Sequence, residues 1–257
     1  MRALLHKELR ELIKTARLAI LPVVFVILGI TGPALIRLLP ILLENAQTEG
    51  IDMTLPEFGP ADAFASYLEM VRQMGLLAVI LVFMGFVAGE RRNGMLASLF
   101  VKPVSRLEYV VTRWAVNGVY VMASLFVGSA VALAYTFLLF APIDVGAVAR
   151  VTLLYASYVL LVFSWTVFLS SLFVHPAAAG GLSVIPLFVL PALGLLWGPL
   201  GDYGPYGAVA GGTATIGAAG SPAEALGSEP LISAALNLGL CVALVAGTYL
   251  RLRRMEL

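Results

Sequence analysis

The chain has 257 residues, of which 60% are hydrophobic and 12% are charged, and its formal net charge is +1. A soluble domain carries about a quarter charged residues because water must wet its surface, so this composition excludes an ordinary soluble protein. The net charge by itself indicates no partner, and we expect none among nucleic acids. Cys241 is the only cysteine, which excludes a disulfide within the chain and a thiolate metal cluster.

Six apolar stretches are long enough to cross a bilayer, which takes a helix of about 20 residues. Each stretch is bounded by charged residues, except that only His175-Pro176 separates the fourth from the fifth. Proline cannot continue a helix without losing a hydrogen bond, so a tight hairpin is expected there. The sequence therefore predicts an all-α membrane protein with one domain over residues 1–257. Its spans are predicted at residues 18–37, 63–90, 106–141, 150–174, 176–198 and 231–250.

Basic residues are concentrated in alternate segments between the spans. The stretch before the first span, the link after the second and the tail after the sixth hold most of them, whereas the other three segments hold only Arg37, Arg72 and Arg150. Cytoplasmic segments of membrane proteins retain such an excess, so both ends of the chain and the link are predicted to be cytoplasmic. A cleaved signal peptide is the alternative for the first span, but residues 31–33 offer no small-x-small cleavage site.

The first 17 residues combine an apolar helical face with basic groups. Their apolar residues recur at helical spacing, and a helix of this kind lies in the membrane interface against lipid headgroups. An ordinary basic flank to the first span is the alternative. The charged residues of this predicted interfacial helix are Lys7, Glu8, Arg10, Lys14 and Arg17.

Two of the segments predicted to lie outside the cell differ in character. Residues 38–61 are acidic and contain three prolines, so we expect them to be mostly irregular, with Asp62 capping the second helix. Residues 199–230 are rich in glycine and alanine and have no basic residue. Two structures fit this composition: a short element that re-enters the membrane, where protein or water must satisfy its backbone, or a flexible surface loop.

Several kinds of catalytic chemistry are excluded by missing residues. The chain has no Gly-x-x-x-x-Gly-Lys-Ser/Thr loop, so it cannot bind ATP in that way. No Asp, Glu, Lys or Arg lies near the middle of a predicted span, which argues against an ion-coupled carrier. There is no Gly-x-Ser-x-Gly motif for an intramembrane hydrolase and no His and Glu set for a metal. We therefore expect no catalytic residue and no metal site.

Pairs of small residues four positions apart mark expected helix contacts. Gly85 and Gly89 form one pair on the second span, and Gly128 and Ala132 form another on the third. Helices in lipid associate where small residues let their backbones approach each other. Such pairs occur in membrane bundles of every function, so they predict packing only.

The link between the second and third spans, residues 91–105, carries the most specific pattern. Asn93-Gly94 is a turn signal. Ser105 and Glu108 have the spacing of a capping box, which would start the third helix. Between the turn and the cap the sequence favours a short transverse helix, and an ordinary basic loop is the alternative.

Glu90 lies just before this link, at a predicted helix C-terminus. The partial negative charge of a helix C-terminus makes a carboxylate unfavourable there. We therefore expect a basic partner for Glu90, either in Arg91 or Arg92 or on another protein.

The link resembles that of ABC-2 type permeases, the membrane subunits of many bacterial ABC exporters. The shared pattern is Glu-x-x-x-Gly-x-Leu followed by Lys-Pro-Val-Ser-Arg and a helix. The likeness extends over the chain, because Lys7-Glu8 opens a segment similar to the elbow helix of that family and a glycine-rich segment precedes the last span. The residues that the resemblance assigns to ATPase coupling are Glu90, Arg91, Arg92, Gly94, Met95, Leu96, Lys102, Pro103, Val104, Ser105 and Arg106.

The resemblance implies a permease that forms half of an export pathway in a prokaryotic inner membrane. Its link would form a coupling helix docked on a separate ABC ATPase subunit. Two copies of that ATPase would hold ATP and magnesium, so this chain would carry no cofactor. A second permease copy or a paralogue would complete the pathway. The alternative is a six-helix carrier, channel or scaffold that no ATPase drives.

Overall fold

In the part of the chain that the computed structural model describes, the protein is helical and has no strand. The described residues are 8, 10, 17–47, 58–94, 105–217 and 227–254. Six helices among them are long and apolar enough to cross a membrane, which confirms the predicted number of spans. The elements are α2 (Arg17–Gln47), α3 (Pro60–Met70), the π-helix η1 (Val71–Gly75), α4 (Leu76–Phe83), α5 (Ala88–Arg92), α7 (Arg106–Leu139), α8 (Val145–Leu172), α9 (Pro176–Leu196), α10 (Gly198–Tyr203), α11 (Gly207–Gly217) and α12 (Ser228–Arg253).

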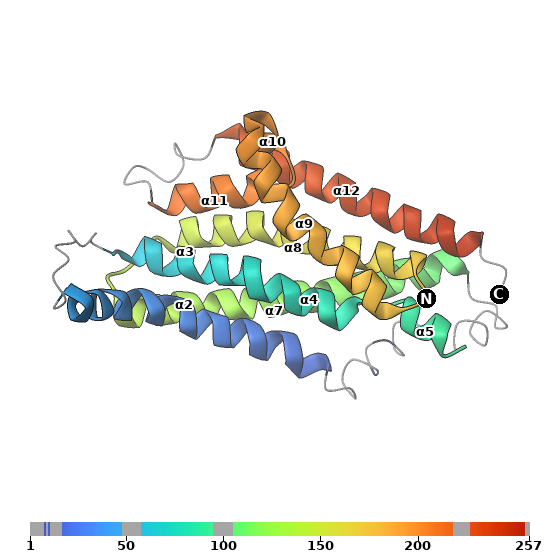
Figure 1. Ribbon diagram of the computed structural model, residues 1–257, viewed down its shortest axis with the longest axis horizontal. Coiled ribbons are helices and arrows are strands. Elements are labelled where there is room, and N and C mark those ends of the chain that lie inside the picture. The colour runs from blue at the N-terminus through green and yellow to red at the C-terminus, as the bar shows by residue number, and fades with distance from the viewer. Residues whose placement is uncertain are drawn as a thin grey trace.

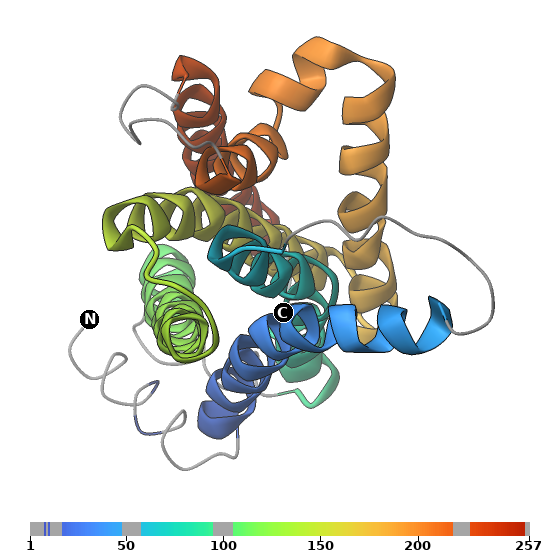
Figure 2. The same cartoon turned by 90° about the vertical axis from the view of Figure 1, so that its left-hand side faces the viewer.

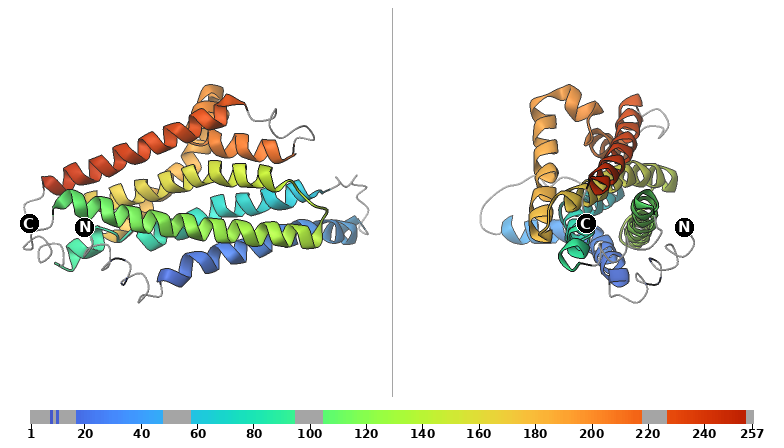
Figure 3. Two further views of the ribbon diagram at one scale, coloured as in Figure 1. Left: turned by 180° about the vertical axis from the view of Figure 1, so that it is seen from behind. Right: turned by 90° about the vertical axis from the view of Figure 1, so that its right-hand side faces the viewer.

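The bundle is built around α8. Most side chains of α8 are buried, and this helix contacts α4, α7, α9, α11 and α12. Helix α2 packs along α7 and α3, and α7, α8 and α12 lie side by side along the long axis (Figures 1 and 3). Helix α9 crosses the others at an angle, and α9 and α10 stand out from the bundle (Figure 2).

The end of the bundle where α5 ends and α7 begins is called the link end here. Helix α12 ends there too, as Figure 1 shows. Arg106, the first residue of α7, donates from its Nη1 to the backbone oxygens of Leu252 and Arg253 at the end of α12. A cation is favourable beside the last carbonyls of a helix, so this contact joins the third and sixth spans at the link end.

The first span is longer than the sequence predicted. Helix α2 runs through Pro40 to Gln47, so the expectation of irregular structure over 38–61 is wrong for residues 38–47. Proline removes one backbone hydrogen bond but does not always end a helix. The residues after Pro40 are mostly good helix formers such as leucine, glutamate, alanine and glutamine, and they continue it. Residues 48–57 lie outside the described residues.

The second span begins at Pro60, and Asp62 is not its cap. The capping residue is Gly59, whose backbone N–H donates to Oδ2 of Asp62 over 2.8 Å. Proline at the first helical position is favourable because its missing N–H would have no helical partner there. Asp62 therefore acts from the third helical position, where its charge complements the helix N-terminus.

Other boundaries also differ from the prediction, in part because a charged residue does not always end a helix. Helix α8 begins at Val145 instead of 150, since Asp144 caps it by accepting from the N–H of Gly146 over 2.8 Å. Helix α12 begins at Ser228 instead of 231 and continues to Arg253, past the predicted end at 250. Helices α7, α8 and α9 each end two residues earlier than predicted, at Leu139, Leu172 and Leu196.

The segment before the sixth span is mostly helical in its described part. Helices α10 and α11 are joined by a turn at residues 204–206, and α11 packs on α8 and α12. The flexible-loop alternative is therefore wrong for this part, while residues 218–226 lie outside the described residues. Two side chains of α12 form hydrogen bonds with the backbone of residues 204–208. Ser233 accepts from the N–H of Ala208 over 2.7 Å and donates to the Gly204 oxygen over 2.6 Å, and Asn237 donates to the Pro205 oxygen over 3.0 Å.

Ser233→Ala is expected to loosen α11 without unfolding the bundle. The change leaves a buried N–H and a buried carbonyl without the serine hydroxyl, a loss of about 1–3 kcal/mol for such groups. The backbone N–H groups of residue 204 and residues 206–210 should then exchange with deuterium about tenfold faster, which hydrogen-exchange mass spectrometry measures. Thr248→Val is the matched control, because the Thr248 hydroxyl donates only one turn back in the same helix, to the Leu244 oxygen over 2.9 Å. Equal exchange in the two variants would contradict this role of Ser233.

Candidate functional site

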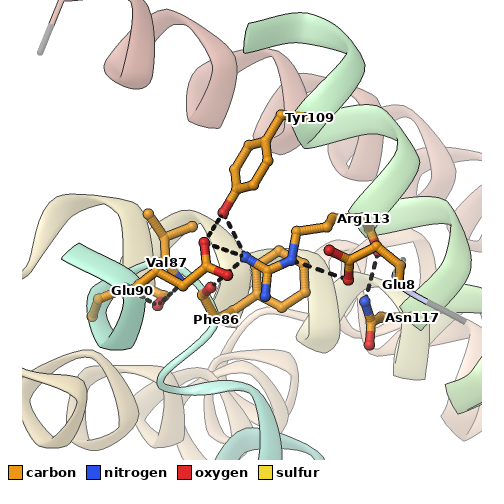
Figure 4. Close-up of polar contacts among 9 residues, drawn as sticks. Glu8, Phe86, Val87, Glu90, Tyr109, Arg113 and Asn117 are labelled. Atoms are coloured by element: carbon orange, nitrogen blue, oxygen red, sulfur yellow. Dashed lines mark hydrogen bonds and ion pairs between the residues drawn. The ribbon is translucent and has the colours of Figure 1, made fainter. Parts of the chain in front are cut away.

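A buried ion cluster joins three parts of the chain at the link end. We call it the Arg113 cluster: Glu8, Phe86, Glu90, Tyr109 and Arg113 (Figure 4). Arg113 on α7 contacts Glu8 through its Nε, which lies 3.3 Å from Oε2. Its Nη1 lies 2.8 Å from Oε2 of Glu90 on α5. One guanidinium therefore links the N-terminal segment, the end of the second span and the start of the third.

Backbone and ring contacts complete the surroundings of this guanidinium. Nη1 of Arg113 also donates to the Phe86 carbonyl oxygen over 3.0 Å, and the guanidinium carbon lies 4.4 Å from the centre of the Phe86 ring. The Tyr109 hydroxyl accepts from Arg113 and donates to Glu90. The planar guanidinium can donate in several directions and stack on a ring at once, so arginine suits this position better than lysine.

The charged side chains of the cluster are largely buried. The side chains of Arg113 and Glu8 are 6% and 5% exposed, and that of Glu90 is 12% exposed. An isolated buried charge is strongly unfavourable, whereas a paired and hydrogen-bonded one is tolerated. The charged group of each segment is therefore stabilised by the charged groups of the others, and the cluster connects the three segments.

The prediction of which residue pairs with Glu90 was wrong. Neither Arg91 nor Arg92 nor another protein is needed, because Arg113 supplies the positive charge from within the chain. In the sequence Arg113 counted only as a basic residue at the edge of the third span. The signal that could have singled it out is the spacing of Tyr109, Arg113 and Asn117, which places three polar groups on one helix face. Asn117 donates to the Arg113 backbone oxygen over 2.9 Å.

The predicted cap of the third helix, which is one half of the predicted capping box, is confirmed. Ser105 caps α7, and its Oγ accepts from the N–H of Glu108 over 3.1 Å. The turn at Asn93-Gly94 is also present, and Gly94 has a positive φ of 67°. Glycine adopts that conformation without a steric penalty.

The remaining residues predicted for coupling and for the interfacial helix are only partly described. Arg10 and Arg92 are exposed, and Arg91 is half-buried. Arg17 opens α2, and its side chain is outside the described part. Lying wholly outside the described residues are Lys7, Lys14, Met95, Leu96, Lys102, Pro103 and Val104.

The two pairs of small residues differ in what they touch. Gly128 and Ala132 face Gly29 of α2, since a Cβ built on Gly29 would lie 2.6 Å from the Gly128 oxygen and 3.2 Å from the Ala132 nitrogen. Gly29 was not singled out from the sequence. A Cβ on Gly85 would reach only 3.9 Å from Pro176, and one on Gly89 would meet nothing within 4 Å in the described part of the chain.

The chemistry of the cluster is ion pairing and hydrogen bonding. Among the residues whose placement is described, no three His, Cys, Asp or Glu side chains gather in a way that could hold a metal ion. The geometry of the cluster is suited to holding helix ends together and to releasing them together.

The chain is similar to a known family and to a relative from a bacterium. The family described as "ABC-2 family transporter protein" matches residues 2–206. A relative from Bacillus subtilis (strain 168), named "Uncharacterized transmembrane protein YxlG", is 30% identical over 188 residues, which cover 72% of this chain and 73% of the relative. The matched range of the family includes the whole Arg113 cluster.

Proposed function

Because the chain belongs to the ABC-2 transporter family, we propose that it is the permease subunit of an ATP-driven exporter. Family membership makes the chain a multi-pass membrane protein with a transport role. In the proposal it forms half of the translocation pathway, with a second copy or a paralogue as the other half. Two separate ATPase subunits bind ATP and magnesium, and residues 91–105 form the coupling helix that docks on them.

The proposal also sets the orientation. The link end faces the cytoplasm of a prokaryotic inner membrane, as the excess of basic residues there indicates. Residues 1–17 form an elbow helix in the interface, and residues 199–230 re-enter the membrane from the outside. The packing of α11 against α8 and α12 supports this placement, since backbone at membrane depth needs protein around it.

The observation that carries the coupling is the Arg113 cluster. Glu90 lies just before the link, and Arg113 lies after the link on α7. Their ion pair therefore holds the two ends of the link close together. Glu8, in the N-terminal segment, is paired with the same arginine. A displacement of the link by an ATPase would therefore move α5, α7 and the N-terminal segment together, and α7 carries α2 with it because the two pack along each other.

Co-purification tests the proposed function. A tagged chain expressed in its native host should bring down an ABC ATPase, and Arg91→Gln with Arg92→Gln should lower the recovered ATPase about threefold to tenfold. The expected loss reflects the roughly 1 kcal/mol that an exposed charge contributes at an interface. Arg150→Gln is the matched control, since the Arg150 side chain is also partly exposed but lies on the first turns of α8, at the other end of the bundle. If no ATPase accompanies the unmodified chain, a carrier, channel or scaffold becomes the better assignment.

A further inference from the structure

The second span is interrupted one turn before Glu90. Residues 84–87 form a turn between α4 and α5 instead of a continuous helix. In an unbroken helix the N–H groups of Val87 and Ala88 would donate to the carbonyls of Phe83 and Met84. Here both donate to Oγ of Ser170 on α8, over 2.9 and 3.1 Å.

Ser170 also bonds the carbonyl that would accept from Ala88 in a continuous helix. Its hydroxyl donates to the Met84 carbonyl over 2.9 Å, so one side chain lies between the donor and the acceptor that would otherwise bond each other. Insertion of a side chain into the helical hydrogen-bond ladder is a known cause of a break. Ser170 is fully buried, so these bonds are shielded from water.

This use of a serine is unlike that of its neighbour. The Ser171 hydroxyl, equally buried, donates to the Phe168 carbonyl of its own helix over 2.6 Å. A bond to the preceding turn is the usual way to satisfy a hydroxyl in an apolar helix. The second contact to the interruption comes from Arg113, which donates to the Phe86 carbonyl over 3.0 Å.

We propose that residues 84–87 are a hinge between the bundle and the end of the second span, and that Ser170 is the positioning residue that holds it in the interrupted form. Residues 84–88 contain no proline, so nothing in the sequence prevents a continuous helix there. The N–H of Ala88 and the carbonyl of Met84 can each bond Ser170 or bond each other, so this part of the backbone has two hydrogen-bonded arrangements. An element with two such packings is what a switching transition requires.

Conversion between the two arrangements changes the Arg113 cluster as well. Forming a continuous helix would rotate the residues that follow the turn about the helix axis, and so would change the positions of Glu90 and the Phe86 carbonyl relative to Nη1 of Arg113. The cluster and the hinge therefore open and close together. This step deepens the proposed function, because the hinge lies between the bundle and the link that the ATPase would move. The existence of the hinge itself needs no partner.

Distances between spin labels in the purified full-length chain test the hinge. Helices α5 and α12 end on opposite sides of the link end (Figure 1). Spin labels are placed at Asn93, directly after α5, and at Arg251 in the last turn of α12. The buried Cys241 is replaced by alanine, and an excess of unlabelled chain in the nanodiscs removes distances between copies. The parent chain should give one main distance, and Ser170→Ala should raise the population of a second distance about tenfold.

Ser171→Ala is the matched control and should leave the distance distribution of the parent chain unchanged. Ser170→Thr keeps a hydroxyl and should restore the main distance, whereas Ser170→Val, of the same shape, should not. This isosteric pair decides the question if the alanine variant does not fold. A single unchanged distance in both the alanine and the valine variants overturns the hinge. Because the measurement uses no ATPase, a failed co-purification would leave its result intact, and the reverse also holds.

Discussion

Arg113→Met is expected to lower the free energy of unfolding by about 3–5 kcal/mol, because it leaves two buried carboxylates without their positive partner. The carboxylates are those of Glu8 and Glu90, at 3.3 and 2.8 Å from the guanidinium. Methionine fills most of the volume, so the loss measures charge and hydrogen bonding more than packing. Unfolding in mixtures of mild detergent and sodium dodecyl sulfate, followed by circular dichroism, gives the free energy.

A half-exposed arginine provides the control for this experiment. Arg150 lies 3.7 Å from Asp144, and their side chains are 41% and 51% exposed. Arg150→Met should therefore change the free energy of unfolding by about 0–1 kcal/mol. Adding Glu90→Gln to Arg113→Met should recover part of the loss, since one of the two uncompensated charges is removed. A loss below about 1 kcal/mol for Arg113→Met would mean that water already solvates the cluster.

The number of spans was predictable because lipid imposes a simple rule. A helix that crosses hydrocarbon must be apolar for about 20 residues, and the charges that bound such runs are visible in the sequence. The rule applies only inside the membrane. Where α2 continues past Pro40 and where α8 starts before Arg150, the helix extends under ordinary helical propensity and capping, and the change from apolar to charged residues no longer marks its end.

The Arg113 cluster was only partly predictable. Glu90 stood out because a carboxylate is unfavourable at a helix C-terminus, and the need for a positive partner followed correctly. The identity of the partner did not follow, since the distribution of basic residues gives the orientation of the chain without showing which arginine is buried. Glu8 is 105 positions from Arg113, and no local pattern in the sequence connects residues that far apart.

The interruption of the second span has no signal in the sequence. Met-Gly-Phe-Val at 84–87 contains no proline, and a single glycine in an apolar run is common in membrane helices. The cause of the break lies on α8, in the hydroxyl of Ser170. A feature created by a side chain from another helix becomes visible only when the two helices are placed side by side.

Gly128→Val is expected to destabilise the contact between α2 and α7 by about 3 kcal/mol, the upper end of the usual cost of overpacking. A Cβ on Gly128 would lie 2.7 Å from Cβ of Phe25 and 2.8 Å from the Phe25 backbone oxygen. It would also come within 2.9 Å of the Tyr67 hydroxyl, which bonds Ser129 over 3.2 Å. Backbone atoms cannot move aside as a flexible side chain can, so the two helices must separate. The same unfolding measurement detects the loss.

Alanine substitutions at two further glycines distinguish the effect of close packing at Gly128 from the general effect of replacing a glycine. A Cβ on Gly239 of α12 or on Gly89 of α5 meets nothing within 4 Å in the described chain. Gly239→Ala and Gly89→Ala should therefore leave stability unchanged or raise it by up to about 1 kcal/mol, since alanine is the better helix former. Gly128→Ala should already be destabilising, and Gly128→Val more so. If all three alanine variants behave alike, the close approach at Gly128 does not hold α2 against α7. A loss at Gly89 would instead indicate that a second chain packs against α5, because small residues in lipid become sensitive where backbones meet.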